Sequence, residues 1–118
     1  MKSNEYIKGT IKTIVLKLLS ENKKMYGYEI SQRVKQLSSG EIELTYGALY
    51  PILYKLENDG LLVTSSEIVD GRVRKYYSLT PPGNETATEK IIELERFADL
   101  LKAILAPAPN VNFKPWGV

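Results

Sequence analysis

Two groups of residues in this sequence have the chemistry needed to contact a polyanion. The first group combines tyrosines with a lysine and two helix-shaping residues: Tyr46, Gly47, Tyr50, Pro51, Tyr54 and Lys55. The second group is a cationic cluster further along the chain: Arg72, Arg74 and Lys75. Guanidinium and ammonium groups bind phosphate oxygens, and tyrosine hydroxyls also donate to phosphates. Both groups would form one nucleic-acid-binding surface if the fold brought them to the same side.

A helix is predicted to present the first group. On a helix of about 3.6 residues per turn, four aliphatic side chains share one face and should enter a core, namely Leu49, Ile52, Leu53 and Leu56. The opposite face, which is nearly free of carboxylates, carries Gly47, Tyr50, Pro51, Tyr54, Lys55 and Asn58. Thr45 is expected to cap the start of this helix and Gly60 its end, while Pro51 interrupts its backbone hydrogen bonding. The pattern indicates a face offered to a partner.

The cationic cluster lies on a predicted β-hairpin. Residues 61–68 and 72–79 have the composition of strands, and Asp70-Gly71 between them is a strong signal for a two-residue type I′ turn. That turn would pair Val69 with Arg72, Glu67 with Arg74 and Ser65 with Tyr76. A presented helix followed by a basic hairpin is the arrangement of the recognition helix and wing of a winged helix-turn-helix.

Apolar spacing predicts further helices over residues 5–20, 27–37 and 85–105, and a short third strand over residues 41–44. In the last helix, apolar residues step by four and three along a heptad-like seam: Ala87, Ile91, Leu94, Ala98, Leu101 and Leu105. This seam could pack within the chain. Its breadth exceeds what so small a domain can cover, so we favour pairing with a second copy.

The expected fold is mainly α with a small β-hairpin. It consists of a winged helix-turn-helix domain over residues 1–80, a C-terminal dimerisation helix over residues 81–106 and a loosely held tail over residues 107–118. Residues 1–80 hold 12 Lys and Arg against 9 Asp and Glu, whereas residues 81–118 hold 4 against 5. Positive charge therefore gathers on the predicted winged domain.

The composition argues against several other functions. The sequence has no Cys and no His, which removes thiolate metal ligands, most zinc sites and the commonest general base. It also lacks the motifs typical of nucleotide binding and nucleophilic catalysis, so we expect no enzyme, cofactor or metal. No apolar run approaches the roughly 20 residues that span a membrane, and no secretory signal precedes the first helix. A cytoplasmic protein is expected.

Four segments, in this order, resemble the PadR family of transcriptional regulators: residues 26–30 (YGYEI), 46–53 (YGALYPIL), 55–61 (KLENDGL) and 71–80 (GRVRKYYSLT). The chain length is similar to that of the shorter PadR subfamily, which has one C-terminal dimerisation helix. The resemblance implies a homodimeric winged-helix repressor that binds a pseudo-palindromic operator in double-stranded DNA. It also implies that both polyanion-binding groups face DNA, and that a small aromatic or cationic effector releases it.

The expected effector site departs from that of the multidrug-binding members of this family. Those members carry a tryptophan on the dimerisation helix, where this sequence has Leu94, and the single tryptophan here is Trp116 in the tail. We expect the effector to contact Leu94, Phe97 and Leu101 in a cleft between paired helices.

Several alternatives remain open at this stage. Tyr46 lies nearest the leucine face and can be structural, Gly47 can be a simple point of flexibility, and the wing cations can be ordinary solvated charges. The principal rival is a winged-helix module that binds protein through the same tyrosine face, because tyrosine is common at protein interfaces. A DNA-binding protein without any effector is a further alternative.

Overall fold

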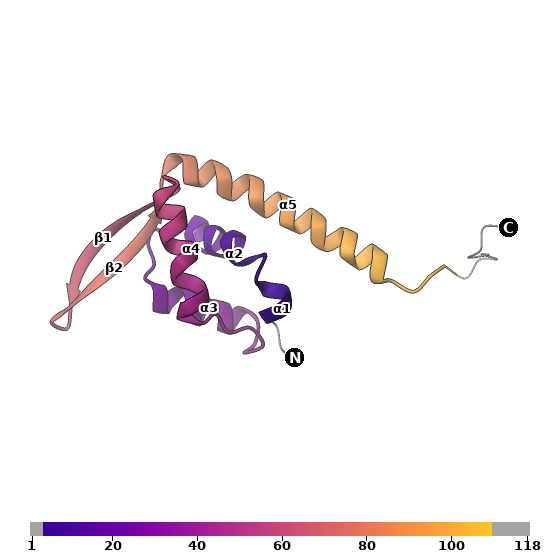
Figure 1. Cartoon of the computed structure of the whole chain (residues 1–118), viewed down its shortest axis with the longest axis horizontal. Helices are drawn as coiled ribbons and strands as arrows, with labels where there is room; N and C mark the ends of the chain where they lie inside the picture. Colours follow the sequence, from indigo (N-terminus) through magenta and orange to yellow (C-terminus); the bar gives the residue numbers. More distant parts are fainter. Residues whose placement is uncertain (1–3, 110–118) are drawn as a thin grey trace.

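Five helices and one hairpin make up the part of the chain that this computed structural model describes, residues 4–109. Figure 1 shows the hairpin projecting from a group of helices and the long last helix running past that group to the C-terminal side. The elements in chain order are α1 (Asn4–Ile7), α2 (Ile11–Glu21), α3 (Gly27–Leu37), α4 (Tyr46–Asn58), β1 (Leu62–Val69), β2 (Arg72–Leu79) and α5 (Pro81–Leu105).

The core lies where α2, α3 and α4 meet the base of the hairpin. Its most deeply buried side chains come from all four elements: Val15, Leu16, Leu18, Ile30, Leu49, Leu53, Leu56 and Tyr77. The predicted core face of α4 is confirmed, because three of its leucines are buried and Ile52 packs at the edge of the same cluster. Burial of each such leucine contributes about 1.5–3 kcal/mol, and it fixes which face of α4 points outward.

Both ends of α4 are formed by local hydrogen bonds, as the sequence predicts. The hydroxyl of Thr45 accepts from the backbone N–H of Ala48 at 3.2 Å. At the other end, the N–H of Gly60 donates to Glu57 and the N–H of Leu61 donates to Leu56, at 3.0 and 2.9 Å. Gly60 follows the last capping residue and has a positive φ of 76°, which completes a Schellman ending and turns the chain into β1.

The hairpin has the predicted register. Val69 lies opposite Arg72, Glu67 opposite Arg74 and Ser65 opposite Tyr76 in an antiparallel pair. Asp70 and Gly71 have φ values of 52° and 76°, the left-handed conformation that a type I′ turn requires at both positions. The turn sequence therefore fixes which side chains share a face of the wing.

One predicted helix is split in two, and one predicted strand is wrong. The helix expected over residues 5–20 is interrupted at residues 8–10, where the N–H and hydroxyl of Thr10 both donate to the carbonyl of Ile7, at 2.8 and 2.7 Å. Residues 41–44 form no strand, although Leu44 is buried. Alternating apolar residues indicate which side chains are buried, but they do not show that the backbone pairs with another strand. The segment that pairs with β2 is instead Met25, which exchanges two backbone hydrogen bonds with Tyr77.

The last helix begins at Pro81, as expected of the segment over residues 81–106, and its two halves lie in different environments. Thr80 caps it by accepting from the N–H of Gly83 at 3.1 Å, so that the helix starts at Pro81. Its first half packs on α2, with Ala87 buried and Ile91 partly buried in the same core. Its second half extends beyond the other helices (Figure 1) and carries exposed apolar side chains.

Candidate nucleic-acid interface

A ridge of three tyrosines lines the outward face of α4. Ring centroids of Tyr46 and Tyr50 are 5.6 Å apart, and those of Tyr50 and Tyr54 are 6.0 Å apart. Tyr46 and Tyr54 are each about half exposed, at 50% and 51%. The helical wheel favoured Tyr46 as the most structural of the three, but Tyr50 is the one that is more enclosed. The exposed positions beside the ridge are Gly47, Pro51 and Lys55.

Tyr50 is enclosed because it packs against the start of α3. A side-chain carbon on Gly27 would lie only 2.4 Å from the Tyr50 hydroxyl, so only glycine leaves room for this ring. Burial raises the pKa of Tyr50, and neighbouring Tyr46 and Tyr54 add to the shift. Tyr50, the middle residue of the ridge, therefore packs α4 against the start of α3.

The wing is joined to α4 at the level of Tyr54. The ammonium of Lys75 lies 3.7 Å from a carboxylate oxygen of Glu57 and 5.5 Å from the centroid of the Tyr54 ring. The hydroxyl of Thr64 donates to the other carboxylate oxygen of Glu57 at 3.2 Å. These contacts place the hairpin face that carries Lys75 beside the tyrosine ridge, whereas Arg72 and Arg74 alternate onto the other face of the hairpin.

A second aromatic and cationic cluster, which the sequence analysis missed, lies on the other face of the hairpin. The guanidinium of Arg74 sits 4.1 Å from the ring centroid of Tyr26, which meets Tyr76 edge to face at 5.5 Å. Lys24 lies 4.7 Å from the Tyr76 ring and pairs with Glu67, the cross-strand neighbour of Arg74. A side-chain hydrogen bond with Tyr76 raises the pKa of Arg74. The segment Tyr26-Gly27-Tyr28 was visible in the sequence. Its place beside the wing, however, depends on the backbone bridge between Met25 and Tyr77, which the sequence pattern does not indicate.

The two clusters meet around a pocket of about 310 Å³ between α3, α4 and β2. Its walls are aromatic and cationic, and they comprise Tyr26, Gly27, Tyr50, Tyr54, Val73, Arg74, Lys75 and Tyr77. Four residues that the sequence singled out are thus brought together, namely Tyr50, Tyr54, Arg74 and Lys75. The other five do not line this pocket: Arg72 is exposed beside the wing turn, and Tyr46, Gly47, Pro51 and Lys55 lie elsewhere on α4.

This order of helices, recognition helix and basic wing matches an established protein family. Residues 15–89 match the family described as "Transcriptional regulator PadR-like family". The chain belongs to the PadR-like family. This regulator is 35% identical over 94 residues to "Transcriptional regulator Rv3488" of Mycobacterium tuberculosis, a match covering 80% of this chain and 84% of that protein.

Solved structures of similar proteins have the same fold. A transcriptional regulator from Clostridium thermocellum superposes with a TM-score of 0.77 at 27% identity, covering 86% of this chain and 99% of that one. A PadR family regulator from Eggerthella lenta gives a TM-score of 0.65 at 32% identity, covering 86% and 82%. This PadR-like protein is therefore a winged-helix transcriptional regulator and not an enzyme.

Tyr77 is the most unusual core residue of the PadR-like regulator. Its ring is fully buried, and its hydroxyl has no hydrogen-bond partner within the described residues 4–109. Burial raises the pKa of Tyr77 to about 12, and Tyr54, Glu57 and Tyr50 add to the shift. Because the unfolded tyrosine ionises near pH 10, its contribution to folding is complete below that pH and is lost as the pH rises towards 12.

We expect Tyr77→Phe to resist alkaline destabilisation better than the wild-type protein. Near pH 7.5 the variant should be as stable as the wild type or slightly more so, because an unpaired buried hydroxyl is removed. The check is urea unfolding at about pH 7.5, 10 and 11. Tyr6→Phe, which alters an exposed tyrosine, is the matched control and should follow the wild type. Equal alkaline losses in all three proteins would contradict the assignment.

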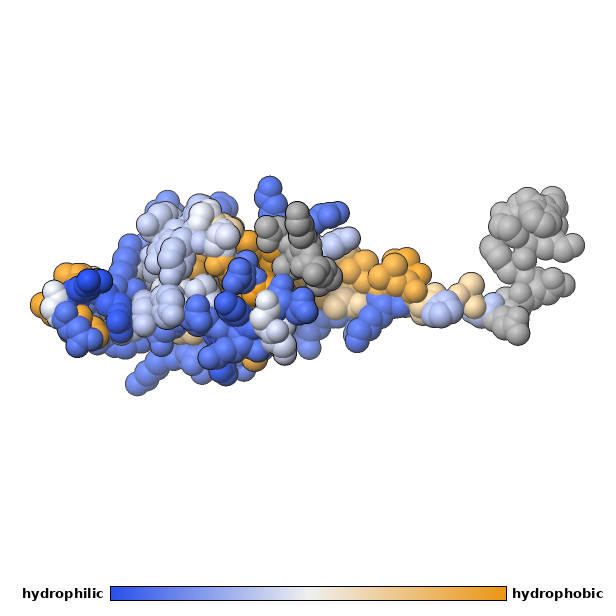
Figure 2. Space-filling view, turned by 90° about the horizontal axis from the view of Figure 1, so that it is seen from below, coloured by the Kyte–Doolittle hydropathy of each residue, from blue (hydrophilic) through white to orange (hydrophobic). Residues whose placement is uncertain are grey.

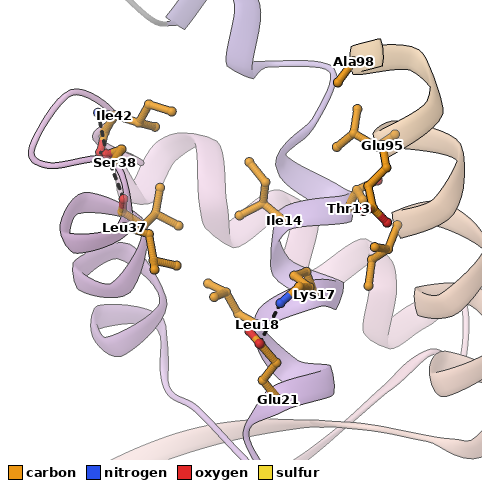
Figure 3. Close-up of a pocket in the computed structure, with 13 residues that line it drawn as sticks. Thr13, Ile14, Lys17, Leu18, Glu21, Leu37, Ser38, Ile42, Glu95 and Ala98 are labelled. Atoms are coloured by element: carbon orange, nitrogen blue, oxygen red, sulfur yellow. Dashed lines mark hydrogen bonds and ion pairs between the residues drawn. The ribbon is translucent and has the colours of Figure 1, made fainter. Parts of the chain in front are cut away.

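A groove of about 560 Å³ opens between α2, α3 and α5 (Figure 3). Its walls are mainly apolar and include Ile14, Leu18, Val34 and Leu94. At its rim, the Lys17 ammonium lies 2.7 Å from Glu21 and lowers the pKa of that carboxyl. Only Leu94 of the three expected effector contacts lines this groove, whereas Phe97 and Leu101 are exposed on other parts of α5.

The predicted dimerisation seam is divided between two uses. Ala87 is only 1% exposed and lies in the core of its own subunit, where Ile91 also packs. Ala98, Leu101 and Leu105 are exposed on the second half of α5, beside a further set of exposed apolar residues: Phe97, Leu100 and Ile104. The exposed part of the predicted seam therefore lies beyond Ile91. Trp116 lies outside the described residues. None of the helices within residues 4–109 combines the length and the hydropathy that a membrane span requires.

Proposed function

We propose that this protein is a cytoplasmic, homodimeric repressor that binds a pseudo-palindromic operator in double-stranded DNA. The observation that carries the proposal is the junction between α4 and the wing, where Lys75 lies beside Glu57 and Tyr54. This junction holds the exposed tyrosine ridge and the Lys75 face of the wing on one side of the protein, with Arg72 and Arg74 on the other face of the same hairpin. In a winged helix-turn-helix, that side is the one that faces DNA.

In the proposed complex, α4 enters the major groove. Tyr46, Tyr54 and Lys55 are exposed there and can contact bases or phosphates. Gly47 has open space at its missing side chain, which allows the helix backbone to approach the sugar-phosphate strand closely. Arg72, Arg74 and Lys75 neutralise phosphates beside the groove and make binding dependent on salt.

The second half of α5 supplies the proposed dimer contact. Its exposed apolar residues have no cover within the described part of the same subunit, and a second copy offers the same surface in return. Pairing would set two copies of α4 about 34 Å apart, one helical turn of DNA. The groove beside Leu94 adjoins this surface and is the proposed site of a small aromatic or cationic effector. A coupling of about 1–3 kcal/mol would then weaken DNA binding by 5- to 150-fold.

We expect Leu101→Glu combined with Ile104→Glu to give a folded monomer. Both side chains are exposed in the single subunit, so the change should leave the winged domain intact while placing charges in the proposed interface. Light scattering after gel filtration measures the mass, and DNA affinity should fall because the half-sites are no longer bound together. Lys102→Glu, on the same turn of α5, is the control for charge alone. A double variant that stays dimeric would place the interface elsewhere.

Selection from a randomised duplex pool tests the function itself. Bound molecules are recovered over several rounds and sequenced, and an enriched inverted repeat with half-sites one helical turn apart is the expected result. Weak binding that disappears in moderate salt, with no enriched sequence, would overturn the repressor proposal. The tyrosine ridge would then be a contact site for another protein.

A further inference from the structure

The tip of the wing carries two solvent-exposed apolar side chains. Ile68 is 79% exposed and Val73 is 74% exposed. They are cross-strand partners, and on each strand one residue separates them from the Asp70-Gly71 turn. Figure 2 shows apolar atoms among hydrophilic ones at the end of the molecule where the hairpin projects. Solubility would favour polar residues at such a tip, so this apolar pair calls for a partner outside the subunit.

The pair continues the face of the hairpin that adjoins the tyrosine ridge. Alternation along the strands puts Ile68 and Val73 on the same face as Lys75 and Tyr77. Along this face, Tyr77 is buried in the core and Lys75 lies beside Tyr54 of the tyrosine ridge. The exposed pair Ile68 and Val73 lies next, at the tip of the hairpin. Val73 lies two residues beyond Lys75, about 7 Å further along the strand.

The local geometry makes the pair a compact projection. In a two-residue hairpin the residues flanking the turn exchange hydrogen bonds, so the next pair, Ile68 and Val73, is of the non-hydrogen-bonded type with the shortest side-chain separation. Their β-carbons are then about 4.5–5.5 Å apart. Lys75 is the cation on the face of the pair, while exposed Arg72 and its neighbour Arg74 lie on the opposite face of the same strand.

An apolar projection flanked by cations is complementary to the DNA minor groove. Phosphates line the two rims of that groove, deoxyribose rings form its walls, and many proteins insert aliphatic side chains there. We propose that Ile68 and Val73 enter the minor groove beside each half-site and favour flexible base steps at that position. The inference rests on the proposed DNA-binding function and adds a sequence preference outside the reach of α4. The wing cations on both faces of this tip, Lys75 on one and Arg72 on the other, favour DNA over an apolar protein surface as the partner.

The test compares two threonine variants on the selected operator. Ile68→Thr with Val73→Thr keeps β-branched side chains in the strands and all wing cations, but makes the tip polar. Val63→Thr is the matched control, because Val63 is 53% exposed on the opposite face of the same hairpin. Two duplexes differ only in the flanking base step, which is TA in one and GC in the other. A further copy of the TA duplex carries 2-aminopurine at that step, and its fluorescence reports unstacking of the bases.

The wild type should prefer the TA duplex and raise 2-aminopurine fluorescence. The double variant should bind the TA duplex roughly tenfold more weakly, lose the preference and the fluorescence change, and keep the salt dependence. The control should match the wild type, and equal urea midpoints for all three proteins show that folding is unaffected. A double variant with unchanged affinity and flank preference overturns the wedge alone. A wild type that binds no duplex overturns both the wedge and the repressor function.

Discussion

Replacing Arg72 and Arg74 with alanine is expected to lower affinity for the operator by two to three orders of magnitude in about 0.1 M salt. A dimer would lose four wing cations, and each phosphate contact contributes a slope of about 0.9 to the dependence of log affinity on log salt concentration. The slope should therefore fall by roughly 3.6. Fluorescence anisotropy of a labelled operator over a series of salt concentrations measures both quantities.

A matched pair on α5 separates wing contacts from net charge. Arg96→Ala with Lys102→Ala removes the same number of charges from exposed positions on the last helix. This control should change the slope far less, because the altered residues lie away from the proposed DNA-facing side. Equal changes in both double variants would mean that the wing makes no specific phosphate contact.

Arg74 requires a variant of its own, because it also stacks on a ring. Its guanidinium lies 4.1 Å from the centroid of Tyr26, an arrangement that suits a flat group better than an ammonium. Arg74→Lys keeps the charge and loses the flat stacking group. If charge alone matters, this variant keeps the wild-type salt slope and affinity; if the stack orients the wing, affinity falls while the slope stays.

The parts of the fold that sequence predicted well depend on local interactions. The register of the hairpin follows from Asp70 and Gly71, whose left-handed backbone permits only one turn type. The faces of α4 follow from the spacing of its leucines, which are buried as expected. Thr45 and Thr80 cap their helices through their own hydroxyl groups. Each of these features is decided within a few residues along the chain.

The parts that sequence missed depend on contacts between distant segments. Tyr26 reaches the wing only because Met25 bridges to Tyr77, and no periodicity in residues 22–30 signals that bridge. The enclosure of Tyr50 depends on the missing side chain of Gly27 in another helix. The seam of α5 looked continuous, yet Ala87 is used by the core of its own subunit. A heptad pattern indicates which side of a helix is apolar but not which neighbour covers it.

Gly83→Ala is expected to be strongly destabilising, because Gly83 lies where α5 crosses the hairpin base. A β-carbon at this position would lie 2.0 Å from the carbonyl oxygen of Leu61 and 3.2 Å from a methyl carbon of Leu79. The Leu61 carbonyl also accepts from the N–H of Thr80 at 3.1 Å, and the Thr80 hydroxyl donates to Gly60 at 2.6 Å. The backbone therefore cannot move aside without breaking the start of α5.

The expected loss is about 3 kcal/mol or more of unfolding free energy, from overpacking against backbone. It should occur even though alanine is intrinsically better than glycine in a helix by up to about 1 kcal/mol. Gly47→Ala isolates that intrinsic preference, because nothing lies within 4 Å of the added carbon in α4. We expect Gly47→Ala to raise the urea midpoint and to weaken DNA binding, since the same open space is where the backbone would meet the sugar-phosphate strand. If Gly83→Ala also raised the midpoint, the crossing of α5 over Leu61 would have to be looser than the structure has it.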